Sequence, residues 1–531
     1  MTRKPLEGHA TRDDPRSPCR LGEHQAEAQK WDSRFYWMLA TLFLWRLIYI
    51  AIAPLDLVPD EAYYWDWSRE LAWGYYSKPP LVAWVNALSS ALLGASPFAV
   101  RLPAVVLGSL SLLALHRFAA HLFNHRVAFW SAAALAASPM SAGFAFLMTI
   151  DTLLLCFWTL ALYSLWRALE DNAANGRWWL LSALAIGLGL LSKQMMLVFL
   201  VLTALHLALT RKHRLWLSRP WPYLMTLLAL LALAPPLWWN MNHGWITFQH
   251  TAHHFELPSE PRAAYAHLWT FLGFVGTQLF LISPLTWLLL AALALPLLLG
   301  IRRQAHTTRF LLLFSAVPLL FFVLASVSKP INANWPAAFY PAGMVLLAGW
   351  AQGALSTETR LDRWRTLFVS GVLVGVCFAV LTYGLTFLLQ GASLGGSKLD
   401  PTARLKGWQA LAQALDRTRQ RLPRPHQTFM LASGRQYVSE MAFYLPQQPK
   451  VYRWNDHKDR VQTQYDLWPG PIDKLGWDAL IILEPHQPVH SDLASAFRSL
   501  TPLGELSVPI GPAGKRSLSL YLGHSLRYWP R

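Results

Sequence analysis

Long apolar segments dominate the first three quarters of the chain. Runs of about twenty hydrophobic residues recur between residues 36 and 389, separated by short polar gaps. Each run is long enough to cross a bilayer core of roughly 30 Å as a helix. The pattern therefore predicts a mostly α-helical, polytopic membrane protein. About eleven spans are expected, at 36–55, 98–122, 127–147, 150–169, 178–192, 194–210, 220–239, 282–300, 309–326, 337–354 and 367–389.

The two ends of the chain are more polar than this membrane domain, which covers residues 36–390. Residues 1–35 lack the apolar core and cleavage site of a signal peptide, and they are expected to form a disordered cytoplasmic tail. Apolar density falls again over residues 391–531. Strands are expected there at Thr428–Ala432, Lys450–Trp454 and Ala479–Leu483, with a closing run at Ser517–Leu522 and a helix over Gln436–Leu445. This alternation predicts a C-terminal soluble α/β domain, with an accessory role over the site or against the acceptor.

Basic residues are concentrated in the short gaps between the apolar runs. The chain carries 46 Lys and Arg against 29 Asp and Glu, for a net charge of +17. Groups such as Arg211–Arg214 and Arg360–Arg365 follow the bias that places Lys and Arg in cytoplasmic loops, so the charge does not indicate nucleic-acid binding. With the N-terminus inside, an odd number of spans places the C-terminal domain on the periplasmic side of the inner membrane.

A few cations are left on the outer face despite this bias. Because outward Lys and Arg run against the usual distribution, each calls for a local partner. A lipid-linked phosphate bound at that face would supply one through charge-assisted hydrogen bonds. The residues concerned are Arg69, Lys78, Arg101, Lys193, Arg262 and Lys329.

The segment after the first span carries the strongest candidate chemistry. Its sequence is VPDEAYYWDWSR over Val58–Arg69, followed by GYYSKPPL over Gly74–Leu81. Adjacent carboxylates, Asp60 and Glu61, are costly to desolvate at a bilayer surface, which favours a functional role. The alternative is an interfacial helix whose aromatic rings lie at the membrane surface and whose N-cap is Asp60. A second interfacial helix is expected over residues 81–94, after the two prolines.

This combined motif resembles the first extracytoplasmic loop of bacterial GT-C glycosyltransferases. The nearest branch is the protein-mannosyltransferase-like one that includes the lipid A aminoarabinose transferases. The resemblance is densest in residues 58–103, with weaker similarity at Leu191–Lys193 and Asn334–Pro336. It implies a GT-C fold and transfer of a sugar from a polyprenyl-phosphate carrier to a lipid A-like lipid or a protein. It also implies that the motif aspartate, here Asp60, takes part in catalysis.

Sugar transfer from a phosphodiester suggests roles for the other polar residues. The leaving phosphate would be held by Lys78 and Lys329, with Arg262 as a possible third contact. Asp60 would act as a general base or stabilise positive charge at the anomeric carbon. Glu61 is also a catalytic candidate, although neighbours on a helix diverge and only one of the pair should face the substrate. Tyr76 belongs to the same motif and is a candidate for substrate binding.

A third carboxylate, Asp151, lies between two apolar runs near the outer end of the fourth span. It is expected to position Asp60 or help hold a divalent cation, or else to cap the span. In the aminoarabinose transferases an acidic residue precedes the motif lysine near a bound metal, whereas this chain has Ser77. Residues 240–281 are expected to form an outer loop, whose histidines have no recognised ligand spacing. The cysteines form no metal motif. The sugar and the metal dependence stay open.

Two other classes of protein are alternatives. A secondary transporter or lipid flippase should place its charges near the bilayer midplane and show two related halves. Here the candidate charges are predicted at the outer interface, and no second half resembles the first. A scaffold with decayed catalytic residues is the other alternative, and the presence of Asp60, Lys78 and Asp151 argues against it.

Overall fold

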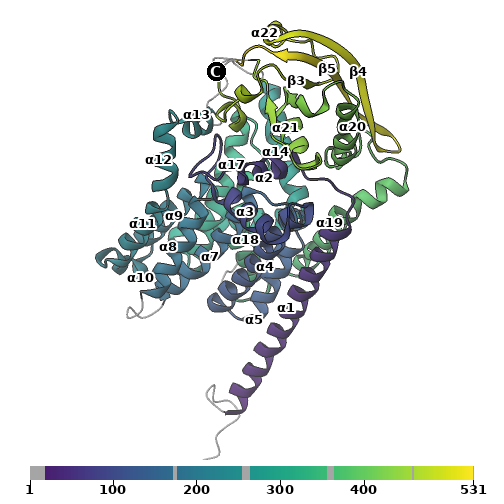
Figure 1. Cartoon of the computed structure of the whole chain (residues 1–531). Coiled ribbons are helices and arrows are strands. Elements are labelled where there is room, and N and C mark those ends of the chain that lie inside the picture. Colours follow the sequence, from purple (N-terminus) through teal and green to yellow (C-terminus); the bar gives the residue numbers. More distant parts are fainter. Residues whose placement is uncertain (1–17, 171–175, 254–263, 356–363, 457–459, 530–531) are drawn as a thin grey trace, which may run out of the picture.

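The computed structural model describes residues 18–170, 176–253, 264–355, 364–456 and 460–529. A bundle of helices forms most of the molecule, and a small α/β domain covers one end of it (Figure 1). This arrangement confirms the predicted fold class.

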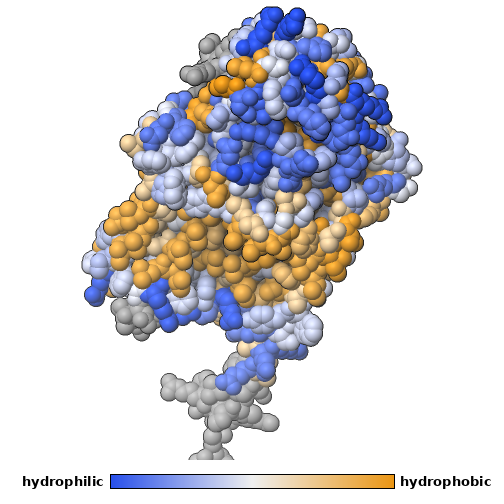
Figure 2. Space-filling view, viewed as in Figure 1, coloured by the Kyte–Doolittle hydropathy of each residue, from blue (hydrophilic) through white to orange (hydrophobic). Residues whose placement is uncertain are grey.

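Apolar helices form the bundle. Seven of the described helices are long and apolar enough to cross a membrane, or eight if one bent pair counts as a span. Figure 2 shows their side chains as an apolar belt between two polar zones, as expected where lipid covers the surface. The helices are α1 (Pro18–Ile52), α4 (Pro97–Leu122), α5 (His125–Ala136), α6 (Pro139–Phe144), α7 (Ile150–Glu170), α8 (Arg177–Leu190), α9 (Leu197–Leu209), α11 (Trp221–Leu231), α12 (Ala234–Asn242), α14 (Ala264–Ile282), α15 (Pro284–Leu299), α16 (His306–Phe314), α17 (Ala316–Ser328), α18 (Tyr340–Ala351) and α19 (Leu367–Gly391).

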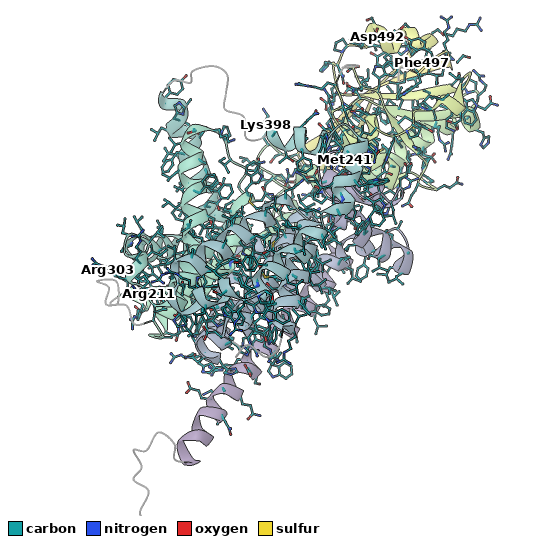
Figure 3. The ribbon with its side chains drawn as sticks, turned by 90° about the vertical axis from the view of Figure 1, so that its left-hand side faces the viewer. Arg211, Met241, Arg303, Lys398, Asp492 and Phe497 are labelled. Atoms are coloured by element: carbon teal, nitrogen blue, oxygen red, sulfur yellow. The ribbon has the colours of Figure 1, made fainter. Side chains whose placement is uncertain are left out.

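Basic residues lie at the end of the bundle away from the α/β domain. Arg211 and Arg303 lie near each other at that end, and Asp492 and Phe497 lie in the domain at the other end (Figure 3). Arg309 joins two of the basic gaps, because its guanidinium donates to the carbonyls of Leu209 and Ile301 at 3.0 and 3.1 Å. The charge separation matches the expected cytoplasmic loops.

Proline interrupts the helix within two of the predicted spans, one of which still forms a single candidate span over Trp221–Asn242. The expected span 127–147 consists of α5 and α6, which are separated just before Pro139, and 220–239 consists of α11 and α12, separated before Pro235. A proline has no backbone N–H and its ring clashes with the preceding turn, so a helix ends or bends there.

The described part of residues 240–281, a segment predicted as an outer loop, is largely helical. Within it lie α13 (Ile246–His253) and α14, and residues 265–282 are apolar enough to span a membrane. Thr, Gly and Gln residues interrupt the apolar run and hide it from a simple hydropathy pattern. α14 begins beside α17, with His267 Nδ1 2.8 Å from the Val327 carbonyl oxygen. After a break at Ser283, α15 continues to the basic gap, so the two helices together occupy the place of one predicted span.

The N-terminal helix is also longer than predicted, because α1 begins at Pro18 rather than near residue 36. The prediction of a disordered tail is therefore wrong for residues 18–35. The Phe35 ring is buried and stacks on His116 at a centroid distance of 3.9 Å, and Asp32 Oδ1 lies 2.6 Å from His125 Nδ1. Ala, Glu, Gln and Lys are good helix formers, which lets the helix continue through this polar stretch. Residues 1–17 lie outside the described part.

The C-terminal domain contains a five-stranded mixed sheet in the order β2-β1-β3-β5-β4. Three strands were predicted closely, but the helix α20 (Trp408–Gln420) and the strand β4 were not. β4 has mostly exposed positions and no alternation of apolar and polar residues, so no strand pattern was visible. The strands are β1 (Thr428–Ala432), β2 (Val451–Arg453), β3 (Asp478–Leu483), β4 (Phe497–Gly511) and β5 (Gly514–Leu526).

This domain rests directly on the motif segment of the membrane domain. The motif forms α2 (Pro59–Ser68), a loop, and α3 (Leu81–Leu93). The domain's helix α21 (Arg435–Tyr444) packs along α2, with the Trp65 and Phe443 rings 4.8 Å apart. The Tyr444 hydroxyl also accepts a hydrogen bond from the Leu57 N–H at 2.7 Å. Residues nearly 400 positions apart are thereby brought to one surface.

Candidate functional site

Asp60 is the second residue of α2, and its side chain remains 53% exposed. Its Oδ1 lies 2.9 Å from Nη1 of Arg435 on α21. The alternative role as N-cap is wrong, because Glu61 makes the capping contact: its Oε2 accepts the Val58 N–H at 3.0 Å. A carboxylate at the third helical position reaches back to the cap in this way. Asp60 is left accessible and held by a single cation.

Glu61 is fully buried, and the chain itself occupies its carboxylate. Arg101 of α4 donates to it at 2.9 Å, and the Met148 N–H donates at 3.0 Å. Arg101 also binds the Leu55 and Asp56 carbonyls, so this outward cation has protein partners and not a lipid phosphate. These contacts of Glu61 join α2, α4 and the turn before α7. Because both of its oxygens are occupied by protein donors, Glu61 does not face a substrate.

Replacing Glu61 with glutamine should lower the free energy of unfolding by about 3–5 kcal/mol, because Arg101 would remain buried without a counter-charge. Chemical or thermal unfolding of the purified protein measures this. The control is Glu70→Gln, whose carboxylate is 43% exposed and pairs with Lys450, and which should change stability by less than about 1 kcal/mol. Equal unfolding midpoints for the two variants would contradict the structural role of Glu61.

Lys78 lies in the loop between α2 and α3 and is half-buried. Within the described residues its ammonium has no hydrogen bond or ion pair. Burial lowers the pKa of Lys78, and the charges of Lys193 and Arg435 lower it further, while Asp151 and Asp60 oppose the shift. The same influences show that three cations and two carboxylates share this region. A desolvated ammonium without a partner is costly, and an anionic ligand would stabilise it.

Asp151 is the second carboxylate of this cluster and lies at the start of α7. It is buried, and both of its oxygens are bound: Lys193 Nζ lies 2.7 Å from one and Asn334 Nδ2 lies 2.8 Å from the other. The described contacts include no helix-capping bond from Asp151, so the capping alternative is not supported. Lys193 and Asn334 come from the two segments of weaker family similarity, which places all three similar segments together.

Of the other predicted site residues, the structure describes Lys329 and Tyr76. Lys329 is the C-cap of α17 and begins the loop that carries Asn334. The Tyr76 N–H donates to Gln464 Oε1 at 2.7 Å, and its ring lies 4.8 Å from that of His250 on α13. Tyr76 therefore contacts the C-terminal domain. Arg262 lies outside the described residues.

Two residues of the cluster were not among the predicted site residues. Lys193 could have been found from the sequence, since it was one of the cations predicted on the outer face, where Asp151 was also predicted. Arg435 had no such signal: it begins a helix of the C-terminal domain, and nothing in the local sequence connects it to Asp60. Its guanidinium lies 4.7 Å from the Tyr63 ring centroid, a cation–π contact that fixes it over α2.

The cluster does not fit the divalent cation that the family resemblance implies. Ser77 supplies a hydroxyl where that resemblance expects a carboxylate, and Asp60 and Asp151 are each paired with a protein cation. A grouping of three metal-donor side chains occurs among the described residues, but it lies at the other end of α7. No metal-dependent step is therefore derived for this site.

The fold and the cluster together define a multi-pass membrane protein with a charged site at the end covered by its α/β domain. Its fold matches that of ArnT from Cupriavidus metallidurans bound to undecaprenyl phosphate, with a TM-score of 0.58 and 18% identity over 93% of this chain and 98% of that chain. The apo structure of the same protein gives a TM-score of 0.55 with the same coverage. These matches confirm the expected GT-C architecture.

Sequence comparisons also find similarity to proteins named as sugar transferases. Residues 77–239 match the family described as dolichyl-phosphate-mannose-protein mannosyltransferase. The lipid A galacturonosyltransferase RgtD of Rhizobium johnstonii is 29% identical over 57% of this chain and 62% of its own length. The undecaprenyl phosphate-alpha-4-amino-4-deoxy-L-arabinose arabinosyl transferase of Pectobacterium atrosepticum is 29% identical over 62% of this chain and 61% of its length. The chain thus spans about six-tenths of the length of these relatives, and the similarity confirms the expected family resemblance.

Proposed function

We propose that this protein is a glycosyltransferase that moves a sugar from a polyprenyl-phosphate carrier to a lipid A-like lipid, or to a protein, at the outer face of the cytoplasmic membrane. The observation that carries the proposal is the Lys78 ammonium, which has no described protein partner and lies in a net positive cluster with Asp60 close by. The names of the relatives and the undecaprenyl phosphate of the matched structure support the same donor class.

The reaction breaks the bond between the anomeric carbon and the phosphate oxygen and forms one from that carbon to the acceptor oxygen. The bond electrons leave with the polyprenyl phosphate, whose added charge Lys78 neutralises, with Lys193 and Arg435 adding to the positive field. If the acceptor is a hydroxyl, its proton passes to Asp60, which is accessible enough to meet it. An acceptor that is already an anion needs no base, and Asp60 then stabilises positive charge on the sugar.

The remaining polar residues hold the groups around Asp60 and Lys78 in place. Asp151 holds Lys193 and is itself held by Asn334, and Glu61 with Arg101 fixes the start of α2, which carries Asp60. Arg435 orients the Asp60 carboxylate from the C-terminal domain. The transporter alternative is disfavoured because this charged cluster lies at one end of the bundle, beneath the α/β domain, and not between two related halves.

The test is mass spectrometry of lipid A, other glycolipids and glycoproteins from cells with and without the gene. The expected result is a sugar-sized mass increase in one class, most readily in lipid A, that depends on the gene. Cells that produce the Lys78→Ala variant at the same level serve as the matched control and should lack the increase. Identical profiles in all three classes, with the protein present in the membrane, would refute the proposal and favour a transporter.

A further inference from the structure

A second cluster of chemically active side chains lies at the opposite end of α7 from Asp151. Glu170 ends this helix, and the 19 residues that separate it from Asp151 correspond to about 28 Å along the axis. His213 of α10 (Arg211–Arg214) and His306 at the start of α16 meet it there. The donor atoms of these three side chains lie within 4.8 Å of one another.

The distances in this cluster suit a tetrahedral metal ion. His213 Nε2 lies 2.9 Å and His306 Nε2 lies 3.5 Å from Glu170 Oε1. Ligands at roughly 2.0–2.1 Å from a tetrahedral Zn²⁺ are about 3.3 Å apart, so these two separations already bracket the required value. Two imidazoles and a carboxylate are also a donor set that Zn²⁺ prefers.

A further histidine supports one of these ligands from behind. His206 Nε2 lies 2.8 Å from His213 Nδ1, and both side chains are buried. In the structure His213 Nε2 is within hydrogen-bond distance of Glu170 Oε1, to which it can donate. When a metal ion replaces that proton, His206 can accept from His213 Nδ1–H, which leaves the lone pair of His213 Nε2 free to bind the ion. Second partners of this kind orient metal-binding histidines and raise their basicity. The contact from His206 on α9 therefore helps to fix the orientation of His213 on α10.

In the structure, the ammonium of Lys212 lies where a metal ion would bind in this cluster. Its ammonium lies 2.6 Å from one Glu170 oxygen and 3.2 Å from His306 Nε2. The side chain is 50% exposed, so it can leave towards solvent when another cation enters. A cavity of about 450 Å³ lined in part by Glu170, Lys212 and His306 lies beside the cluster and offers a path for entry.

We propose that Glu170, His213 and His306 form a binding site for a divalent transition metal of the Zn²⁺ class, which Lys212 closes when the metal is absent. The bound ion would join the inner ends of α7, α9–α10 and α16, because one ligand comes from each. The site is distant from the transfer cluster, and its occupancy does not depend on the proposed glycosyltransferase activity.

The test uses the full-length protein, purified without a histidine tag and stripped with a chelator. Titration with ZnCl₂ by calorimetry, with metal content checked by mass spectrometry, measures affinity and stoichiometry. The wild type should bind an equivalent that the Glu170→Gln/His306→Gln double variant loses or binds at least about tenfold more weakly. His426→Gln, which removes an exposed histidine of the C-terminal domain, is the matched control and should bind like the wild type.

Substitution of Lys212, whose ammonium competes with the metal, provides an independent test. Its expected result is a gain of Zn²⁺ binding, which misfolding would not produce. Lys212→Met should bind Zn²⁺ more tightly than the wild type, and Zn²⁺ should raise its melting temperature by more. Co²⁺ in place of Zn²⁺ should show the visible absorption of a tetrahedral site in the wild type and not in the double variant. Equal Zn²⁺ binding by the wild type and a folded double variant would overturn the proposal, as would weaker binding by Lys212→Met.

Discussion

Replacing Lys78 with alanine should lower the rate of sugar transfer by at least about 10²-fold, because in the proposed mechanism it removes the ammonium that neutralises the leaving phosphate. The fold should survive, since the ammonium makes no described contact that supports the protein. Loss of a cation with a pKa lowered by burial and by Lys193 relieves repulsion in the free enzyme. Turnover of purified protein with a polyprenyl-phosphate sugar measures the rate, and thermal melting checks the fold.

Two further variants separate charge from geometry at this position. Lys78→Arg should keep part of the activity, because the positive charge is retained while the planar guanidinium cannot reproduce the contact of a compact ammonium. Lys398→Ala changes an exposed lysine in the segment between α19 and α20 (Figure 3) and should leave turnover unchanged. Wild-type turnover by Lys78→Ala would remove this residue from the donor site.

Replacing Asp60 with asparagine should reduce turnover by about 10²-fold or more, with a change in stability below about 1 kcal/mol. Asparagine has nearly the same shape but can neither accept a proton nor stabilise positive charge on the sugar. The small stability effect follows from the exposed position of the side chain and from the absence of a capping role, which belongs to Glu61. The measurements are turnover per folded molecule and the melting temperature of the same preparation.

The Arg435 contact provides the matched comparison for Asp60. Arg435→Gln removes the cation that orients Asp60 but keeps the carboxylate, so it should cost less activity than Asp60→Asn. If Asp60→Asn melts early and yet retains normal turnover per folded molecule, Asp60 has a structural role and the catalytic assignment is wrong. The opposite combination, stable protein with little turnover, is the expected one.

Much of the architecture could be predicted from local pattern. Apolar runs of membrane-spanning length and the position of Arg and Lys between them follow from the cost of burying charge in lipid, which acts on each segment separately. The buried strands β1 and β3 were visible because their apolar runs are bounded by polar residues. The motif from Val58 to Leu81 predicts a candidate site that includes Asp60 and Lys78, since both lie close together in sequence.

The sequence by itself determined the membrane class, the basic loops, the C-terminal α/β domain and the motif that carries Asp60 and Lys78. Only the tertiary structure decided how the charges pair. Glu61 and Asp60 are neighbours in sequence, but a helix turns one into the bundle towards Arg101 and the other outwards to Arg435. Lys193 pairs with Asp151 across 42 positions and Arg435 with Asp60 across 375, and no local pattern records such contacts. The physical reason is that ion pairing depends on distance and burial in space, which the packing of α21 on α2 sets and the order of residues does not.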